Sequence, residues 1–134
     1  MILIVCLDDK NGMMFNRRRQ SKDSAVRADM IAEAGGKTLW MNSYSAKQFE
    51  EPAADICVDE AFLEKAGEGE FCFLEGTGAG TAEAAAEKLI IYKWNRLYPS
   101  DVKFDIDLDG WTLESTVEFA GSSHEKITKE VYIK

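Results

Sequence analysis

The apolar run ILIVCL at Ile2–Leu7 is the feature that most limits the folds open to this chain. A strand with one wet face alternates apolar and polar residues, whereas a run that is apolar throughout is typical of a buried strand in a parallel sheet. The turn signal of Asp8–Gly12 ends this run. Further strands are predicted at the short segments 37–41, 71–74 and 89–94, and the segment 55–58 is predicted to be a short strand or an extended link.

Stretches with helix signals lie between these strands. The longest, 21–34, repeats apolar residues at Val26, Met30 and Ala34, so one face of this helix is expected to pack against the sheet. Ser21, Asp23 or Ser24 can cap the helix, and Gly35 and Gly36 end it. Shorter helices are predicted at 42–50, where Pro52 prevents continuation, at 59–66 and at 81–88.

The pattern changes in the last third of the chain, where apolar and polar residues alternate at 102–108, 111–119 and 127–133. Period-two alternation predicts half-exposed antiparallel strands. The last two segments are expected to form a hairpin around Gly121–Ser123, at the edge of the sheet. The 134 residues suit one domain, 1–134, so the chain is predicted to be a single α/β domain with a mixed sheet.

The charge balance excludes several classes of partner. The net charge is −8, from 16 Lys and Arg against 24 Asp and Glu, which argues against nucleic acids and anionic membranes. No apolar run approaches the roughly 20 residues that span a bilayer, and the first residues do not resemble a signal peptide. Cys6, Cys57 and Cys72 lie in apolar stretches without CxxC spacing, which suits reduced, buried thiols in a cytoplasmic protein.

The single histidine, His124, limits the chemistry further, because it excludes zinc sites built on several histidines. A Ser-His-Asp or Cys-His site would have to use His124, which lies in the turn-like string GSSHEK. The string DIDLDG at 105–110 copies the start of a calcium loop, but Thr116 stands where a bidentate glutamate belongs. These aspartates are more simply explained as the water-facing side of a strand, and no metal site is predicted.

Several strings, taken in order, resemble the dihydrofolate reductase family. ILIVCLDDKNGM is similar to the family's first strand and the turn leading to its active-site loop, and KTLWMNSYSAKQF to its second strand and the following helix. VDEAFLEKAGEGEFCFLEGTG, KLIIYKW and SDVKFDID are similar to later segments. The resemblance covers about residues 1–49 and 58–134, and it implies a three-layer fold with helices on both faces of the sheet. A helix-and-strand stretch of the family between these ranges is largely missing.

The resemblance places Val26 where the family has its catalytic carboxylate. Asp23 and Asp29 lie one turn either side and are the only candidates for a replacement acid. The alternative is structural, with Asp23 at the helix start and Asp29 on a solvated face.

The family's phosphate-binding Gly-Arg-x-Thr reads Asn42-Ser43-Tyr44-Ser45 here, and its double glycine reads Leu74-Glu75, with Gly76 following. The glycine-rich turn could still offer backbone N–H groups to an anion, although a tight strand-to-helix crossover needs glycine anyway. The candidate cofactor-binding residues are therefore Gly76, Thr77, Gly78, Gly80, Thr81, Asn42, Ser43 and Ser45. With the arginine lost and Glu75 added, NADPH is expected to bind weakly, and no cofactor is assigned.

Two functions remain. The favoured one is a divergent dihydrofolate reductase-like protein that has lost folate reduction and binds a small anionic or nucleotide ligand or another protein, including a second copy of itself. The alternative is an active NAD(P)H-dependent reductase of the dihydrofolate reductase or riboflavin-pathway type.

Met13–Phe15 is predicted to be a short apolar stretch, and residues 16–20 are predicted to form a polar loop. The only basic cluster, Arg17–Arg19, is interpreted as solvated or paired with acids, or as a phosphate contact.

Overall fold

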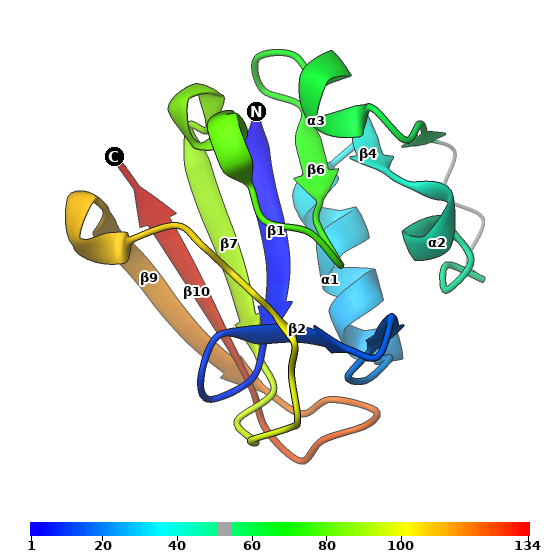
Figure 1. Cartoon of the computed structure of the whole chain (residues 1–134), viewed down its shortest axis with the longest axis vertical. Helices are drawn as coiled ribbons and strands as arrows, with labels where there is room; N and C mark the ends of the chain where they lie inside the picture. The colour runs from blue at the N-terminus through cyan, green and yellow to red at the C-terminus, as the bar shows by residue number, and fades with distance from the viewer. Residues whose placement is uncertain (51–54) are drawn as a thin grey trace.

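In the computed structural model, β1 (Ile2–Leu7) is an interior strand of a seven-stranded sheet (Figure 1). The structure describes residues 1–50 and 55–134, and the predicted stop at Pro52 lies outside them. β1 pairs in parallel with β6 (Phe71–Phe73) on one side and β7 (Lys88–Lys93) on the other. The buried central strand that the apolar run predicts is therefore confirmed.

The sheet has the order β5-β4-β6-β1-β7-β10-β9. β4 (Leu39–Met41) pairs in parallel with β5 (Ile56–Val58) and with β6. β10 (Ile127–Ile133) runs antiparallel to β7 and pairs with β9 (Thr112–Phe119) in an antiparallel hairpin at the edge. The predicted parallel centre and C-terminal hairpin are both confirmed.

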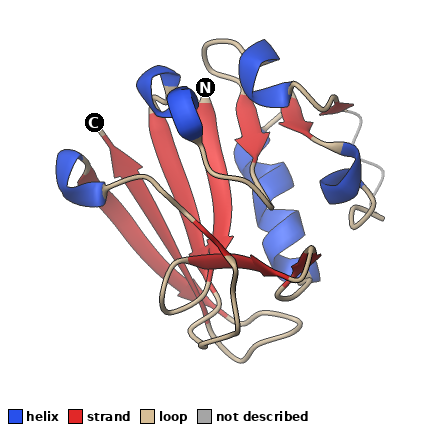
Figure 2. Cartoon of the chain, in the orientation of Figure 1, coloured by secondary structure: helices blue, strands red, loops and turns tan. Residues whose placement is uncertain are grey.

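Helices lie on both faces of the sheet, as expected (Figure 2). α1 (Ser24–Ala34) and the residues around α2 (Ser43–Ala46) pack on one apolar cluster, which includes Ile4 and Ile90. The opposite cluster, which includes Leu3 and Leu89, is covered by several short elements. They are α3 (Phe62–Lys65), the 3-10 helices η1 (Gly80–Ala85) and η2 (Leu108–Gly110), and a small antiparallel sheet of β2 (Gly12–Phe15), β3 (Arg18–Arg19) and β8 (Val102–Lys103).

Four predicted elements are wrong in extent. The alanine-rich segment 81–88 is a short 3-10 helix and not an α-helix, because Lys88 already pairs with Ile2 in the sheet and helix propensity is a weak preference. The predicted helices at 42–50 and 59–66 shrink to α2 and α3. The predicted strand at 102–108 is only β8, although Phe104 and Ile106 still turn into the core.

β9 departs from the predicted half-buried pattern, because every residue from Thr112 to Glu118 is exposed. This edge strand has one neighbour, β10. Leu113 and Val117 are 47% and 52% exposed, while Ile127 on β10 is fully buried. Alternation in the sequence therefore marks a strand here without showing that one of its faces is covered.

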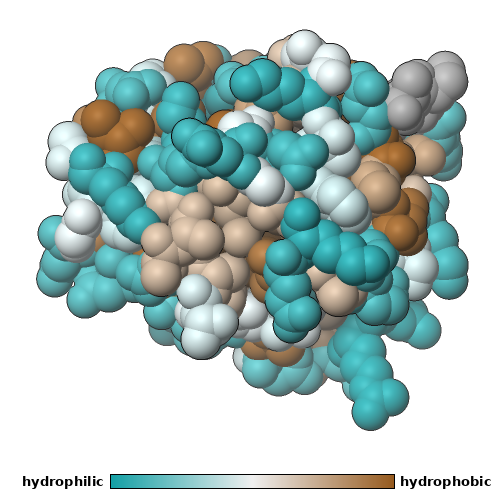
Figure 3. All heavy atoms as spheres, turned by 90° about the horizontal axis from the view of Figure 1, so that it is seen from above, coloured by the Kyte–Doolittle hydropathy of each residue, from teal (hydrophilic) through white to brown (hydrophobic). Residues whose placement is uncertain are grey.

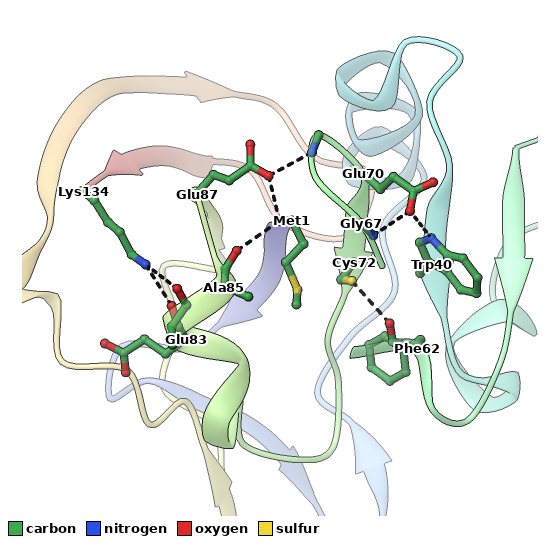
Figure 4. Close-up of polar contacts among 12 residues, drawn as sticks. Met1, Trp40, Phe62, Gly67, Glu70, Cys72, Glu83, Ala85, Glu87 and Lys134 are labelled. Carbon is green, nitrogen blue, oxygen red and sulfur yellow. Dashed lines mark hydrogen bonds and ion pairs between the residues drawn. The ribbon is translucent and has the colours of Figure 1, made fainter. Parts of the chain in front are cut away.

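The loops at the start of β1 are held by two glutamates (Figure 4). Glu87 accepts hydrogen bonds from the Met1 amine (2.7 Å) and from Gly69 N (2.8 Å). Glu70 accepts from Gly67 N (2.7 Å) and from Trp40 Nε1 (3.1 Å). Figure 3 shows the molecule from above, where hydrophilic and hydrophobic residues lie side by side on the surface.

Within the two described ranges, no helix has the length and apolar character needed to cross a membrane.

The contrast between β9 and β10 predicts different costs for similar truncations. Ile127→Ala should lower the free energy of unfolding by about 2–5 kcal/mol, because it leaves a cavity in the core. Leu113→Ala should change it by no more than about 0.5 kcal/mol, because that side chain is already half in water. Urea denaturation of both variants measures this, and equal losses would show that β9 is covered in solution.

Candidate functional site

A cleft of about 390 Å³ opens where β4 and β6 end, beside β2 and β8. Ligands of open α/β sheets bind at the carboxyl ends of the parallel strands, and small-molecule pockets occupy about 300–1,000 Å³. Its lining residues are Met14, Arg17, Asn42, Tyr44, Glu75, Gly76, Thr77, Asp101 and Val102. Asn42, Gly76 and Thr77 are thus the predicted cofactor-binding residues that this cleft brings together.

Position 76 in the cleft has no space for a side chain. Its φ is +79°, and a Cβ atom there would lie 2.9 Å from Met14 Sδ. Met14, Tyr44 and Val102 supply apolar surface, and Arg17, Asn42, Thr77 and Asp101 supply polar groups. The cleft therefore combines an apolar wall with a few polar groups, as small-molecule sites do.

Glu75 does not present a free negative charge to the cleft. Its carboxylate is 9% exposed and accepts hydrogen bonds from Arg19 Nε (3.1 Å) and Arg19 Nη2 (3.2 Å). Ser45 Oγ (2.8 Å) and Gln48 Nε2 (3.2 Å) donate to the same carboxylate. The sequence predicts an acid opposing a phosphate, and the structure corrects this, because Arg19 neutralises the acid.

Arg19 also binds Tyr44 in three ways. Its Nη2 donates to the Tyr44 carbonyl (3.1 Å), its backbone N donates to the Tyr44 hydroxyl (3.0 Å), and its guanidinium lies 4.2 Å from the ring centroid. The stretch 16–20, predicted as a polar loop, instead contains β3, which pairs with β2 in a hairpin. The sequence singles out Arg19 as part of the basic cluster Arg17–Arg19, and its pairing with Glu75 agrees with the interpretation that the cluster pairs with acids. Gln48 does not stand out in the sequence, because only the fold brings it to Glu75.

The tip of this hairpin has an unusual backbone. Asn16 and Arg17 have φ values of 51° and 62°, in the left-handed region that favours glycine. A two-residue turn with two positive φ values matches the twist of a hairpin, and Asn-Gly is its preferred sequence. Arg17 stands in the position of that glycine and lines the cleft.

Several predicted anion donors are already used within the chain. Ser45 N donates to Asn42 Oδ1 (2.8 Å), as the cap of α2, and Ser43 N donates to Glu60 Oε2 (2.9 Å). Ala79 N donates to Asp105 Oδ1 (2.8 Å), and a Cβ on Gly78 would lie 2.5 Å from Asp105 Oδ2. The Asp105 carboxylate therefore occupies the glycine turn where an external anion was expected.

Gly80 and Thr81 lie apart from the other predicted cofactor-binding residues. They line a second cleft of about 410 Å³ with Glu83, Ala84 and Lys134. The glycine-rich segment therefore divides between two clefts, and only its first part adjoins Asn42.

Asp23, the first candidate acid, joins α1 to the β9–β10 turn. Its Oδ1 caps α1 by accepting from Ala25 N (2.9 Å) and Val26 N (3.1 Å). Its Oδ2 accepts from Ser123 N (2.8 Å) and Ser123 Oγ (2.7 Å). Burial alone would raise the pKa of Asp23, but these hydrogen bonds outweigh it and lower the pKa to about 2.

Asp29, the second candidate acid, is not on a purely solvated face. It accepts from the Tyr92 hydroxyl (2.5 Å) and pairs with Lys129 Nζ (2.7 Å), which also contacts Glu33. Burial, followed by the bond to Asp29, raises the pKa of Tyr92. Neither Asp23 nor Asp29 lines the cleft, and Val26, at the family's carboxylate position, is 2% exposed in the core.

His124 does not form a catalytic triad. Its Nδ1 lies 2.6 Å from Ser123 Oγ and its Nε2 2.6 Å from the Tyr98 hydroxyl, while its ring stacks on Trp94. Ser123 Oγ donates its proton to Asp23, so the serine lies between the acid and the histidine. In a triad the histidine is central and accepts the serine proton.

The three thiols differ in their burial. Burial raises the pKa of Cys72 to about 12, and Cys6 and Cys57 are partly buried, less than predicted. Among the described residues, no three His, Cys, Asp or Glu side chains lie together as a metal would need. In the string that resembles a calcium loop, Asp107 caps η2 by accepting from Asp109 N (2.9 Å).

A third and much smaller cavity, of about 10 Å³, lies beside Glu75. Its lining residues are Cys6, Met13, Arg19, Gln20, Ser21, Leu74, Glu75 and Trp94. This volume holds at most one water molecule. Gln20 Oε1 is buried without a hydrogen-bond partner among the described residues.

No protein-family model and no curated protein matches this chain in sequence.

The two roles of Asp23 can be separated by pH. Its pKa falls from 3.8 to about 2 on folding, which is worth about 2 kcal/mol of stability. This stability is present above pH 4 and lost as the pH falls toward 2. Asp23→Asn keeps a good cap, so its deficit in urea denaturation should be about 2 kcal/mol at pH 6 and shrink toward zero at low pH.

Asp23→Ala serves as the comparison, because it also removes the cap and should cost a further ~1 kcal/mol at every pH. A deficit of Asp23→Asn that did not depend on pH would contradict the assignment.

Proposed function

We propose that this chain is a divergent member of the dihydrofolate reductase-like group, that it does not reduce folate, and that it binds a small anionic or nucleotide ligand in the cleft beside Gly76. The observation that carries the proposal is the cleft itself, where Arg17 and an apolar wall line the same space at the carboxyl ends of parallel strands. Within the described residues, no ion pair engages Arg17.

The arrangement of the sheet supports the family part of the proposal. The resemblance implies a parallel centre formed by the first strand and the strands at 37–41, 71–74 and 89–94, with a C-terminal hairpin at its edge. β1, β4, β6 and β7 are adjacent and parallel, and β10 joins the β9 hairpin to β7. The order of the motif strings thus agrees with one continuous sheet.

The polar groups of the cleft favour a ligand with little negative charge. Arg17 is the cation, and Asp101, whose Oδ2 accepts from Asn16 N (3.1 Å), is an acid on the same lining. A phosphate monoester can contact Arg17 and the Thr77 hydroxyl while a ring lies against Tyr44, Met14 and Val102. A diphosphate carries more charge than one arginine can offset, so NADPH is expected to bind less well than a mononucleotide.

The candidate acids are poorly placed for folate chemistry. Reduction of a dihydropterin needs a proton donor near the ring and a bound nicotinamide. Val26 can donate no proton, and Asp23 and Asp29 are engaged in structural contacts. The cavity beside Glu75 has a volume of about 10 Å³, which is too small for a pterin ring.

Purified protein should therefore show no turnover of dihydrofolate with NADPH, followed as the loss of NADPH absorbance. Asp23→Asn and Asp29→Asn are the matched variants. Turnover that either substitution abolished would show that a recruited acid works here, and the proposal would fail.

The strained turn gives a sharper test of the ligand site. Arg17→Gly relieves a left-handed non-glycine residue, which should raise stability by up to about 1 kcal/mol after the entropic cost of glycine. The same change removes the cation, so the affinity for adenosine monophosphate should fall about tenfold in calorimetry. Gained stability with lost binding would mark Arg17 as a residue kept for function.

Asn16→Gly is the control, because it changes the neighbouring left-handed residue of the same turn and leaves Arg17 in place. It should keep wild-type affinity. Equal binding by Arg17→Gly and Asn16→Gly would refute the anion site. Low-micromolar binding of NADPH by the unchanged protein would instead favour the active reductase.

A further inference from the structure

We infer that Glu75, Ser45, Gln48 and Tyr44 form a binding site for a planar cation, a guanidinium or amidinium group, which Arg19 of this chain fills as an internal and displaceable occupant. This site goes beyond the proposed function, because it lies on the inner side of Glu75 and takes the opposite charge.

The site is built of buried side chains. Ser45 is 0% exposed, Gln48 5% and Glu75 9%. Ser45 Oγ and Gln48 Nε2 both donate to Glu75 Oε1, so neutral donors hold the carboxylate in place independently of Arg19. Burying a carboxylate without a nearby cation costs free energy. The Glu75 carboxylate can still accept further hydrogen bonds, and a cation can donate them.

The contacts match a planar cation better than an ammonium group. Arg19 Nε and Nη2 approach the two carboxylate oxygens side by side, at 3.1 and 3.2 Å. Nη2 also donates to the Tyr44 carbonyl, and the guanidinium carbon lies over the Tyr44 ring, 4.2 Å from its centroid. A guanidinium or amidinium group makes the paired and stacked contacts together, whereas a point charge does not.

The segment that delivers Arg19 is weakly held. β3 has two residues and lies at the edge of the small sheet, where it pairs only with Met14 and Phe15. The turn before it holds Arg17, a strained residue with positive φ, and the cavity behind it is lined by Gln20, whose buried Oε1 has no hydrogen-bond partner among the described residues. Glu75 lines both this cavity and the outer cleft, so withdrawal of Arg19 would join the two.

The test uses methylguanidinium chloride as the probe and methylammonium chloride at equal concentration as the control for salt and charge. Arg19→Ala should bind methylguanidinium at least tenfold more tightly than wild-type protein, measured as a dose-dependent rise in Tm, because the tethered competitor is gone. Methylammonium should give no comparable rise. Arg18→Ala, a change on the same strand, should behave as wild type.

Hydrogen exchange measures the displacement of Arg19 in the wild-type protein. In the filled site the Arg19 amide donates to the Tyr44 hydroxyl, so its hydrogen exchange in wild-type protein should accelerate with methylguanidinium and not with methylammonium. Unchanged exchange would overturn the claim that the occupant is displaceable.

Three other outcomes would overturn the site itself. They are equal stabilisation of Arg19→Ala by methylammonium, an affinity of Arg19→Ala no tighter than that of wild type, and an undiminished response of the double variant Arg19→Ala with Glu75→Gln. If Arg19→Ala folds only when methylguanidinium is present, that recovery supports the site. If neither probe restores folding, the site is refuted.

Discussion

The double pairing of β1 is the constraint on which the rest of the structure depends. Ile4 lies opposite Phe73 on β6 and Ile90 on β7, and its side chain is fully buried. Because the strand is covered on both faces, α1 must lie on one side and the short elements on the other. The carboxyl ends of β1, β4 and β6 then meet at one edge of the sheet, where every cavity near Glu75 is found.

Buried carboxylates at that edge connect segments that are distant in sequence. Asp8 is 2% exposed and accepts from Gly12 N, Gln20 Nε2 and Tyr98 N. Asp23 connects α1 to the β9–β10 turn, and Glu75 connects β6 to β3 and α2. An unpaired buried acid would be costly, so each carboxylate holds its loops in one arrangement. On a chain of charge −8, part of the acidic surplus is thus structural.

The sequence predicts the sheet well because hydrophobic periodicity is a local signal, as at Ile2–Leu7 and at the C-terminal hairpin. It predicts the candidate site less well, because polar partners there are chosen by the fold. From the sequence, Glu75 is expected to repel a phosphate. In the fold its carboxylate pairs with Arg19, which lies fifty-six residues away in sequence. Asp105 appears to be a strand residue or a calcium ligand, yet it fills the turn at Ala79. Asp23 is the exception, since a helix cap is read from neighbouring residues alone.

The register shift in the β9–β10 hairpin has a consequence for how copies of this chain meet one another. Ser115 lies opposite Val131, but the next pair is Leu113 with Tyr132. Val117 lies opposite Lys129, so Leu113 and Val117 point to opposite faces of the sheet. The open edge therefore carries no continuous apolar stripe, and Glu114 and Glu118 add charge along it. Bulges and charges of this kind discourage a second sheet from adding to an edge, so the longest exposed strand of the molecule is protected against aggregation.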